Sequence, residues 1–177
     1  MASDPYPSYS YLINHNGSIT SNRVYEVKGN IINKGGLIAN NLGGVISLNN
    51  SGSILSNNLP FSGRSMGSII YNNLEGVIFN NTVGIGGIAN NISLDIISNS
   101  CFSINNNKTK AIVGNNLNIL PVFEGTSSDI SFNKTQGDII NNICSRINNN
   151  TTKRSIWSNN ITGVISNNTA DQISQNT

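Results

Sequence analysis

The acidic residues are the side chains with the greatest capacity for chemistry in this sequence. They are Asp4, Glu26, Glu75, Asp95, Glu124, Asp129, Asp138 and Asp171. Glycoside-cleaving enzymes need two carboxyl groups about 5–10 Å apart, as acid and as base or nucleophile. Only Glu124, Asp129 and Asp138 lie close together along the chain. Because Asp129 and Asp138 begin strand-like units at the position that Gly holds elsewhere, we expect them at chain corners and not in catalysis.

No other combination of nucleophile, base and metal ligand stands out. His15 is the only histidine and lies outside the repeated units, so it is predicted to be a surface residue. Two cysteines cannot by themselves complete a four-ligand zinc site. The Gly-rich run 84–88 lacks the Lys-Ser/Thr pair that a phosphate-binding loop requires. The sequence therefore predicts no catalytic residue, no cofactor and no metal, and a protein that is not an enzyme.

Cys101, Cys144 and Trp157 complete the set of candidate residues. The two cysteines are expected to be buried free thiols, and the alternative is a pair that meets across stacked strands. Trp157 replaces the small residue that is usual in its unit. This position favours a core or exposed stacking role over a sugar-binding role.

The composition restricts the partners of the protein. The 177-residue chain contains 35 Asn, 27 Ile, 24 Ser and 17 Gly, and 10% of its residues are charged. A net charge of +2 gives no basic footprint for nucleic acid, and no segment approaches the ~20 apolar residues of a membrane span. Neither partner is therefore predicted. The basic residues of the second half are interspersed with acids, which predicts a solvated face; they are Lys108, Lys110, Lys134, Arg146, Lys153 and Arg154.

Short apolar runs that end on an Asn pair recur along the chain. They are GLIANN (36–41), GVISLNN (44–50), GSILSNN (52–58), GSIIYNN (67–73), GVIFNNT (76–82), GGIANN (86–91), AIVGNN (111–116), GDIINN (137–142), SIWSNN (155–160) and GVISNNT (163–169). The 127 residues from Asn40 to Asn167, divided into fifteen steps, give a period of about 8.5 residues. Runs rich in Ile and Val between Gly and Asn are typical of short strands, and no window has a helical pattern. The predicted fold class is all-β.

The connections between strands distinguish the all-β folds. Tight hairpins favour Asn-Gly and Asp-Gly, but the chain has one Asn-Gly, at residues 16–17, and no Asp-Gly. A single-chain parallel β-solenoid (β-helix) is therefore favoured over an antiparallel sandwich or barrel, and over a disordered or amyloid-like chain. Ile would form an inner column, and Asn would occupy left-handed corners and stack in ladders. Three short strands per rung are predicted, which makes a rung of about 25 residues.

A longer pattern overlies the short one. Its instances are Ile104-x-x-Asn107-x-Thr109, Ile130-x-x-Asn133-x-Thr135, Ile147-x-x-Asn150-x-Thr152 and Ile165-x-x-Asn168-x-Ala170. With GGLI (35–38), GGVI (43–46) and GGI (86–88), this pattern resembles the autotransporter passenger repeats of the chlamydial polymorphic membrane proteins, whose motifs are FxxN and GGA followed by Ile, Leu or Val. Residues 102–105 match FxxN, and no GGA occurs. The resemblance covers residues 35–170 as a style of repeat, and it implies a β-helix and surface adhesion.

The two ends differ from the middle. Residues 1–25 are predicted to form a non-repeat arm or cap, with a disordered tail as the alternative, and residues 26–177 the β-solenoid repeat domain. Tyr6, Tyr9 and Tyr11 are the candidate assembly residues, since Tyr offers a large contact area at low entropic cost. The repeat runs to the last residues without a recognisable cap, so we expect end-to-end stacking, a truncated chain or an unrecognised cap.

These features favour a non-enzymatic structural protein, a β-solenoid subunit of an extracellular or surface fibre or coat. It would self-associate by stacking or strand pairing. The alternative is an adhesin passenger domain that binds a surface glycan or receptor, and a β-helix enzyme that degrades polysaccharide comes third. The expected location is extracellular, or the surface of a cell or particle, although the first residues show no secretory signal.

Overall fold

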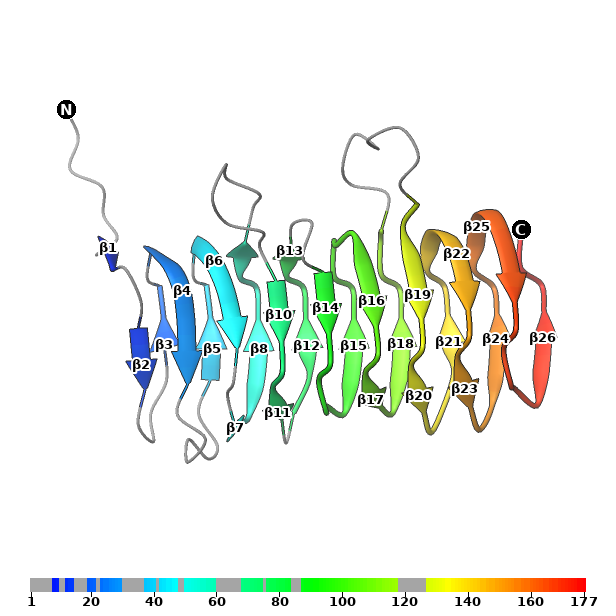
Figure 1. Cartoon of the computed structure of the whole chain (residues 1–177), viewed down its shortest axis with the longest axis horizontal. Helices are drawn as coiled ribbons and strands as arrows, with labels where there is room; N and C mark the ends of the chain where they lie inside the picture. The colour runs from blue at the N-terminus through cyan, green and yellow to red at the C-terminus, as the bar shows by residue number, and fades with distance from the viewer. Residues whose placement is uncertain are drawn as a thin grey trace.

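Short parallel strands make up the fold. The computed structural model describes residues 8–9, 12–14, 19–21, 23–29, 37–40, 42–47, 50–59, 68–74, 76–83, 87–117 and 127–177. Within these residues there is no helix, and the paired strands run parallel. The all-β, parallel prediction is therefore confirmed, and the arrangement is consistent with a β-helix or solenoid (Figure 1).

Two large sheets face each other. Sheet A has twelve strands: β1 (Ser8–Tyr9), β2 (Leu12–Asn14), β4 (Arg23–Gly29), β6 (Leu42–Ser47), β9 (Asn58–Leu59), β10 (Ser68–Ile70), β13 (Thr82–Val83), β14 (Gly87–Ala89), β16 (Ser103–Asn105), β19 (Asp129–Ser131), β22 (Ile143–Asn148) and β25 (Asn160–Ser166). Sheet B has nine strands: β3 (Ile19–Thr20), β5 (Leu37–Ala39), β8 (Ser53–Leu55), β12 (Ile78–Phe79), β15 (Asp95–Ile97), β18 (Ala111–Val113), β21 (Ile139–Ile140), β24 (Ser155–Trp157) and β26 (Gln172–Ser174).

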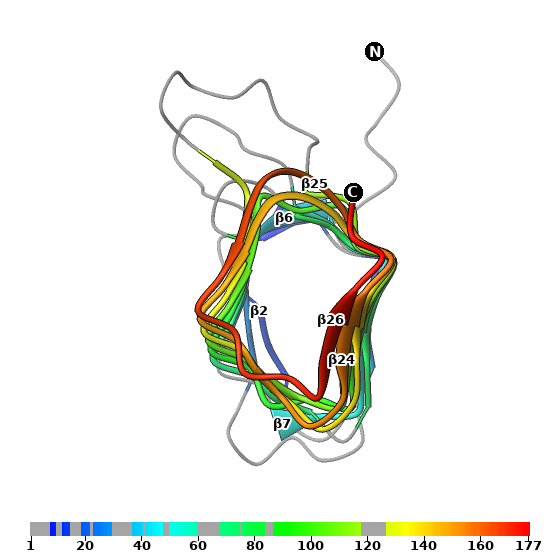
Figure 2. The same cartoon turned by 90° about the vertical axis from the view of Figure 1, so that its right-hand side faces the viewer.

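Two small sheets lie beside them. β17 (Lys108–Thr109), β20 (Lys134–Thr135) and β23 (Thr151–Thr152) form a three-stranded sheet, and β7 (Asn50–Ser51) pairs with β11 (Asn73–Leu74). Along the chain, strands of sheet B alternate with strands of sheet A. Each passage through both sheets forms one turn, and successive turns stack as a coil. Seen along the stack, the turns superpose on one outline (Figure 2).

Isoleucine fills the space between the two sheets. The register aligns the central Ile of each sheet B strand with the Ile of the next turn, and sheet A does the same. The fully buried members are Ile38, Ile54, Ile78, Ile96, Ile112, Ile139 and Ile156 in sheet B, and Ile46, Ile69, Ile88, Ile104, Ile130 and Ile147 in sheet A. Burying one such side chain contributes about 1.5–3 kcal/mol, and β-branched residues suit strands. The predicted Ile column is confirmed, as two columns.

Each corner consists of two residues with different roles, and the second of them is an Asn. The first residue of each corner is left-handed, with φ between +51° and +62° at the thirteen corners that precede an inward-pointing Asn. Asn and Ser, which hold most of these corners, tolerate that conformation when they can hydrogen-bond locally. The second residue points inward, and it is buried at most corners.

The inward Asn residues form two ladders. One contains Asn57, Asn81, Asn99, Asn115, Asn142, Asn159 and Asn176, and the other contains Asn72, Asn91, Asn107, Asn133, Asn150 and Asn168. At every step the side-chain Nδ2 and the backbone N–H both donate to the Oδ1 of the next Asn, at 2.9–3.0 Å. Nδ2 also donates to backbone carbonyls of the strands. These bonds satisfy polar groups that would be costly to bury unpaired.

Each regular turn is shorter than the sequence predicts. Successive ladder residues are 16 to 19 positions apart in eight steps. In the three remaining steps the ladder residues are 24, 26 and 27 positions apart. Each of these steps includes segment 60–67 or segment 118–126, and both segments lie outside the described residues. The expected rung of about 25 residues is wrong for the regular turns. One Ile-to-Asn unit crosses sheet B and the next crosses sheet A, so a turn contains two units and not three.

Candidate functional site

The outer face of sheet B carries a continuous line of apolar side chains. Successive residues of a strand point to opposite faces, so the residue after each buried Ile faces outward. In six aligned strands this residue is apolar and larger than alanine. We call these residues the outer column: Leu55, Phe79, Ile97, Val113, Ile140 and Trp157. Five are half-buried by their neighbours, and Phe79 exposes 41% of its surface. The corresponding outward residues of sheet A include Asn105, Ser131, Asn148 and Ser166. The two faces of the coil therefore differ in polarity.

A hollow lies at the end of the outer column, beside Trp157. It has a volume of about 480 Å³ and is lined by Asp138, Arg154, Ser155, Trp157, Asp171, Gln172, Ser174 and Gln175. In the register, Trp157 is followed by Ser174 on the next turn. Because serine is small, the column that continues from Ile140 to Trp157 is interrupted there, which leaves the space. We call this feature the Trp157 hollow.

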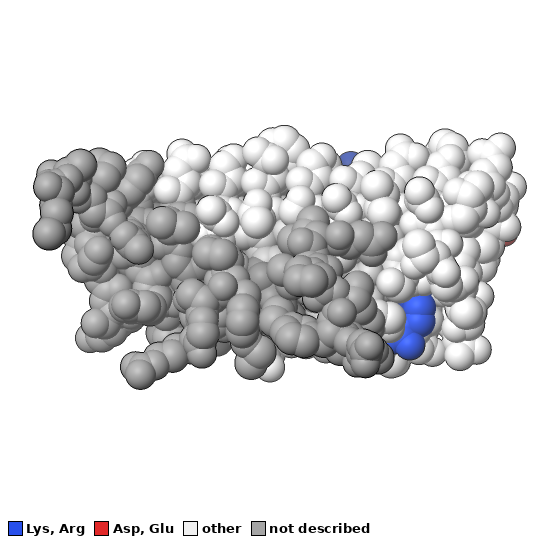
Figure 3. Space-filling model, turned by 90° about the horizontal axis from the view of Figure 1, so that it is seen from above, with Lys and Arg blue, Asp and Glu red and all other residues white. Residues whose placement is uncertain are grey.

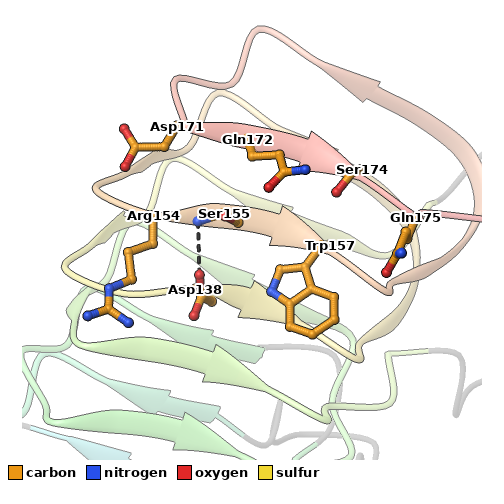
Figure 4. A pocket seen from close by; sticks show the side chains of 8 residues that line it. All are labelled: Asp138, Arg154, Ser155, Trp157, Asp171, Gln172, Ser174 and Gln175. Carbon is orange, nitrogen blue, oxygen red and sulfur yellow. Dashed lines mark hydrogen bonds between the residues drawn. The ribbon is translucent and has the colours of Figure 1, made fainter.

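The polar groups of the Trp157 hollow come from three successive turns. Figure 4 shows Arg154 and Asp171 at one end, Trp157 and Gln175 at the other, and Gln172 and Ser174 on the upper strand between them. Asp138 is held in place because its Oδ1 accepts a hydrogen bond from the backbone N–H of Ser155 at 2.9 Å. A carboxylate retains further acceptor positions after one such bond.

The acidic residues predicted for chain corners are not brought together. Asp129 is the first residue of β19 in sheet A, and Asp138 precedes β21 in sheet B on the opposite side of the coil. Asp129 pairs with Arg146 of the next turn, with an Oδ1–NH2 distance of 3.0 Å. Glu124 lies outside the described residues. Asp129 and Asp138 thus occupy the strand-start positions that the sequence predicts, and they form no acid–base pair.

Both cysteines are buried free thiols, as predicted. The residues that precede Cys101, Leu117 and Cys144 are bridged in successive turns, so Leu117 lies between the two thiols. Two rung spacings amount to about 9.6 Å, beyond the ~7 Å limit between Cα atoms that a disulfide can bridge. The alternative pairing across strands is therefore wrong.

Both thiols are expected to be unreactive in the folded protein. Burial raises the pKa of both, to about 12 for Cys144, where the charge of Asp129 adds to the effect of burial. At pH 8 neither side chain forms the reactive thiolate. Ellman's reagent should therefore detect no thiol in the native protein and both after denaturation without reductant. Rapid labelling of either cysteine in the native state would contradict this arrangement.

The remaining predicted residues fall into two groups. Tyr6, Tyr11 and His15 lie outside the described residues, and Tyr9 belongs to β1, which pairs with β4. Because β1, β2 and β3 also pair with strands of the repeat, the parallel sheets include strands from residues 1–25. The six basic residues of the second half are all exposed, so they are solvated as predicted, but they are spread over more than one face.

The face seen in Figure 3 carries few charged side chains among its described residues. Seen from above, its described part is almost entirely uncharged (Figure 3). Within the described ranges, no group of three or more His, Cys, Asp and Glu residues is placed to hold a metal ion. Among these same residues, no helix is long and apolar enough to span a membrane.

Comparisons with known proteins found no match to this chain. No protein-family model matches the chain, and neither the curated proteins nor the solved structures contain a match.

Proposed function

We propose that this protein is a non-enzymatic structural β-solenoid, which self-associates into a fibre or coat outside a cell or on the surface of a cell or particle. The observation that carries the proposal is the outer column of sheet B. An aligned row of six outward apolar side chains is unusual on a chain whose other outward positions are mostly amides and hydroxyls. Pairing with another apolar face would remove this row of side chains from water, which is favourable. The occupant that we assign to it is the same face of a second copy.

The size of the outer column sets the strength of that contact. Five steps of ~4.8 Å make the column about 24 Å long, and three residues of a strand span about 10 Å. Two rods that pair over this area bury about 500 Å², which is less than the ~1,200 Å² of a stable interface. A single pair is therefore weak, and an array gains strength from many such contacts. The low charge of the chain, at 10% of residues, limits electrostatic repulsion between rods.

The number of strands in each turn of the coil is also part of the proposal. We assign three strands to each regular turn: one in sheet B, one in sheet A and a short polar one such as β17, β20 or β23. β17 and β20 are Lys-Thr and β23 is Thr-Thr, so these three strands contain no Ile. Stacking at the ends of the coil, strand pairing and a contribution of Tyr6, Tyr9 and Tyr11 to assembly remain predictions from the sequence.

Sedimentation velocity over a wide range of concentrations tests the proposed association. We expect the weight-average sedimentation coefficient of the wild type to rise with concentration. Phe79→Lys should abolish the rise, because two symmetric copies would bring buried like charges together. Phe132→Lys is the matched control, since Phe132 exposes 60% of its surface at a corner of sheet A. A wild type that stays monomeric at high concentration, with no fibres in negative-stain micrographs, would overturn the proposal.

A second candidate function is supported by the Trp157 hollow. An adhesin passenger domain would need a binding site on its surface, and this hollow combines a half-buried aromatic ring with several polar side chains. The resemblance to chlamydial polymorphic membrane proteins favours this candidate as well. A glycan or a protein receptor would be the partner.

A further inference from the structure

The Trp157 hollow has a stacking surface for a ring-shaped ligand. Trp157 is half-buried on the outer face of sheet B, and small Ser174 follows it on the next turn. Its indole is held by the coil and loses little conformational freedom when a ligand binds. The volume of about 480 Å³ lies within the range of small-molecule sites. A ligand with one apolar ring face would pack against the indole.

The polar side chains around the indole can hydrogen-bond to hydroxyl groups on the edge of a ligand ring. Asp138 supplies a carboxylate acceptor that is positioned by the N–H of Ser155. Gln172 and Gln175 are exposed and carry amides that both donate and accept. A pyranose ring has C–H groups on its faces and hydroxyls on its edge, so it can stack on an indole and hydrogen-bond to these groups at the same time.

The charge of the lining selects among carbohydrates. Two carboxylates, from Asp138 and Asp171, and the guanidinium of Arg154 leave a net charge of −1 at neutral pH. Uronic-acid and sulfated polymers would be repelled by this lining. Neutral hexose or N-acetylhexosamine units carry no such penalty.

We infer that the Trp157 hollow binds a neutral pyranose unit of a polysaccharide or surface glycan, with Trp157 as the stacking platform and Asp138 and Gln172 as hydrogen-bonding groups. The inference concerns the ligand of this hollow, and it does not depend on self-association through the outer column. Because Trp157 also belongs to the outer column, a second copy that covered the whole column would compete with the ligand for this side chain.

The single tryptophan of the chain makes the test specific, because the intrinsic indole fluorescence comes from this site alone. We would titrate the full chain, at a concentration where it is monomeric, with cellohexaose, maltohexaose, mannohexaose and chitohexaose. Polygalacturonate and heparin are the anionic comparisons. At least one neutral probe should change the fluorescence saturably below about 10 mM, and the anionic polymers should not.

Variants separate binding at this site from other causes. Trp157→Ala should weaken binding at least about tenfold by calorimetry, since it removes the stacking surface. Gln172→Ala should weaken it about three- to tenfold, as expected for one hydrogen bond. Gln136→Ala is the matched control at another exposed glutamine and should bind like the wild type. Circular dichroism would show that each variant remains folded.

Three outcomes would overturn the inference. The first is that no neutral probe changes the fluorescence up to about 10 mM. The second is that binding of a neutral probe survives in Trp157→Ala. The third is that only polygalacturonate or heparin binds. Because Phe79→Lys tests self-association and leaves the lining of the hollow intact, glycan binding can be measured in that variant even if the wild type aggregates.

Discussion

Replacing Asn142 with alanine is expected to lower the free energy of unfolding by at least about 3 kcal/mol. The Asn142 side chain is fully buried. Its Nδ2 donates to the carbonyls of Ile112 and Ile140 and to Oδ1 of Asn159, at 2.9–3.1 Å. Its Oδ1 accepts from the backbone N–H and the Nδ2 of Asn115, at 2.9 and 3.0 Å. Alanine would leave these buried partners without Asn142, and each unsatisfied group costs about 1–3 kcal/mol.

Urea-induced unfolding measures this loss. Asn160→Ala is the matched control, because Asn160 is exposed in β25 of the following turn and its backbone N–H donates to the carbonyl of Asn142. We expect Asn160→Ala to change the free energy of unfolding by less than about 0.5 kcal/mol, as for other surface substitutions. Equal effects of the two substitutions would show that the ladder contributes no more than an exposed amide.

Asn142→Asp distinguishes hydrogen bonding from packing, because the side chain keeps its size. The introduced carboxylate cannot donate to the two carbonyls or to Asn159. Burial raises its pKa in the folded state above that in the unfolded chain. The folded state then binds more protons in the window between these two pKa values, so the variant should become more stable, relative to the wild type, as the pH falls through that window. A pH-independent difference would contradict this account.

The second large effect is expected for Ile112→Ala. Ile112 is fully buried in the sheet B column between Ile96 and Ile139 of the adjacent turns. Truncation leaves a cavity that stacked strands with fixed spacing cannot close, and such substitutions cost about 2–5 kcal/mol. We expect a loss in this range from thermal or urea unfolding.

Ile92→Ala is the control for this substitution. Ile92 exposes 49% of its surface, so the same chemical change should cost well under half as much. If the two variants lose equal stability, the aligned Ile residues do not form the core. Both variants should keep the far-ultraviolet spectrum of a β protein at low temperature.

The parallel all-β architecture followed from the sequence because Ile and Asn recur with one local spacing. In Ile139-x-x-Asn142, as in Ile130-x-x-Asn133, the first residue is inside a strand and the second is inside a ladder. The left-handed corners held by Asn or Gly were also predictable, since these residues tolerate that conformation, whereas those held by residues such as Tyr71 and Phe132 were not. The sequence does not show which member of an Asn pair is buried, because both have the same side chain.

The length of the turn could not be predicted from the same spacing. Two consecutive units look alike along the chain, yet one lies in sheet B and the next in sheet A. The short strand that follows sheet A, such as Lys134–Thr135, contains no apolar residue and gives no strand signal. The repeat of the single Ile-to-Asn unit therefore did not show that one turn of the coil contains two such units.

The outer column and the Trp157 hollow were missed, although a signal existed. From Ile54 to Ile156, the residue after the buried Ile is apolar in every second unit, as in Phe79, Ile97 and Val113, and is often polar in the units between, as in Asn105 and Ser131. This alternation has twice the period of the Ile pattern. The neighbours that complete the hollow come from three turns, and only the stacking of those turns brings them to Trp157.

Hydrogen exchange of the Asn side-chain amides, followed by NMR, tests the two ladders most directly. The account predicts that the Nδ2 hydrogens of ladder residues such as Asn115, Asn133 and Asn142 persist in deuterium oxide for as long as the backbone amides of the adjoining strands. Those of exposed Asn58 and Asn160 should exchange at the rate of a free amide. Exchange of all the Asn side chains at that free rate, in a folded protein, would contradict the buried ladders on which the coil depends.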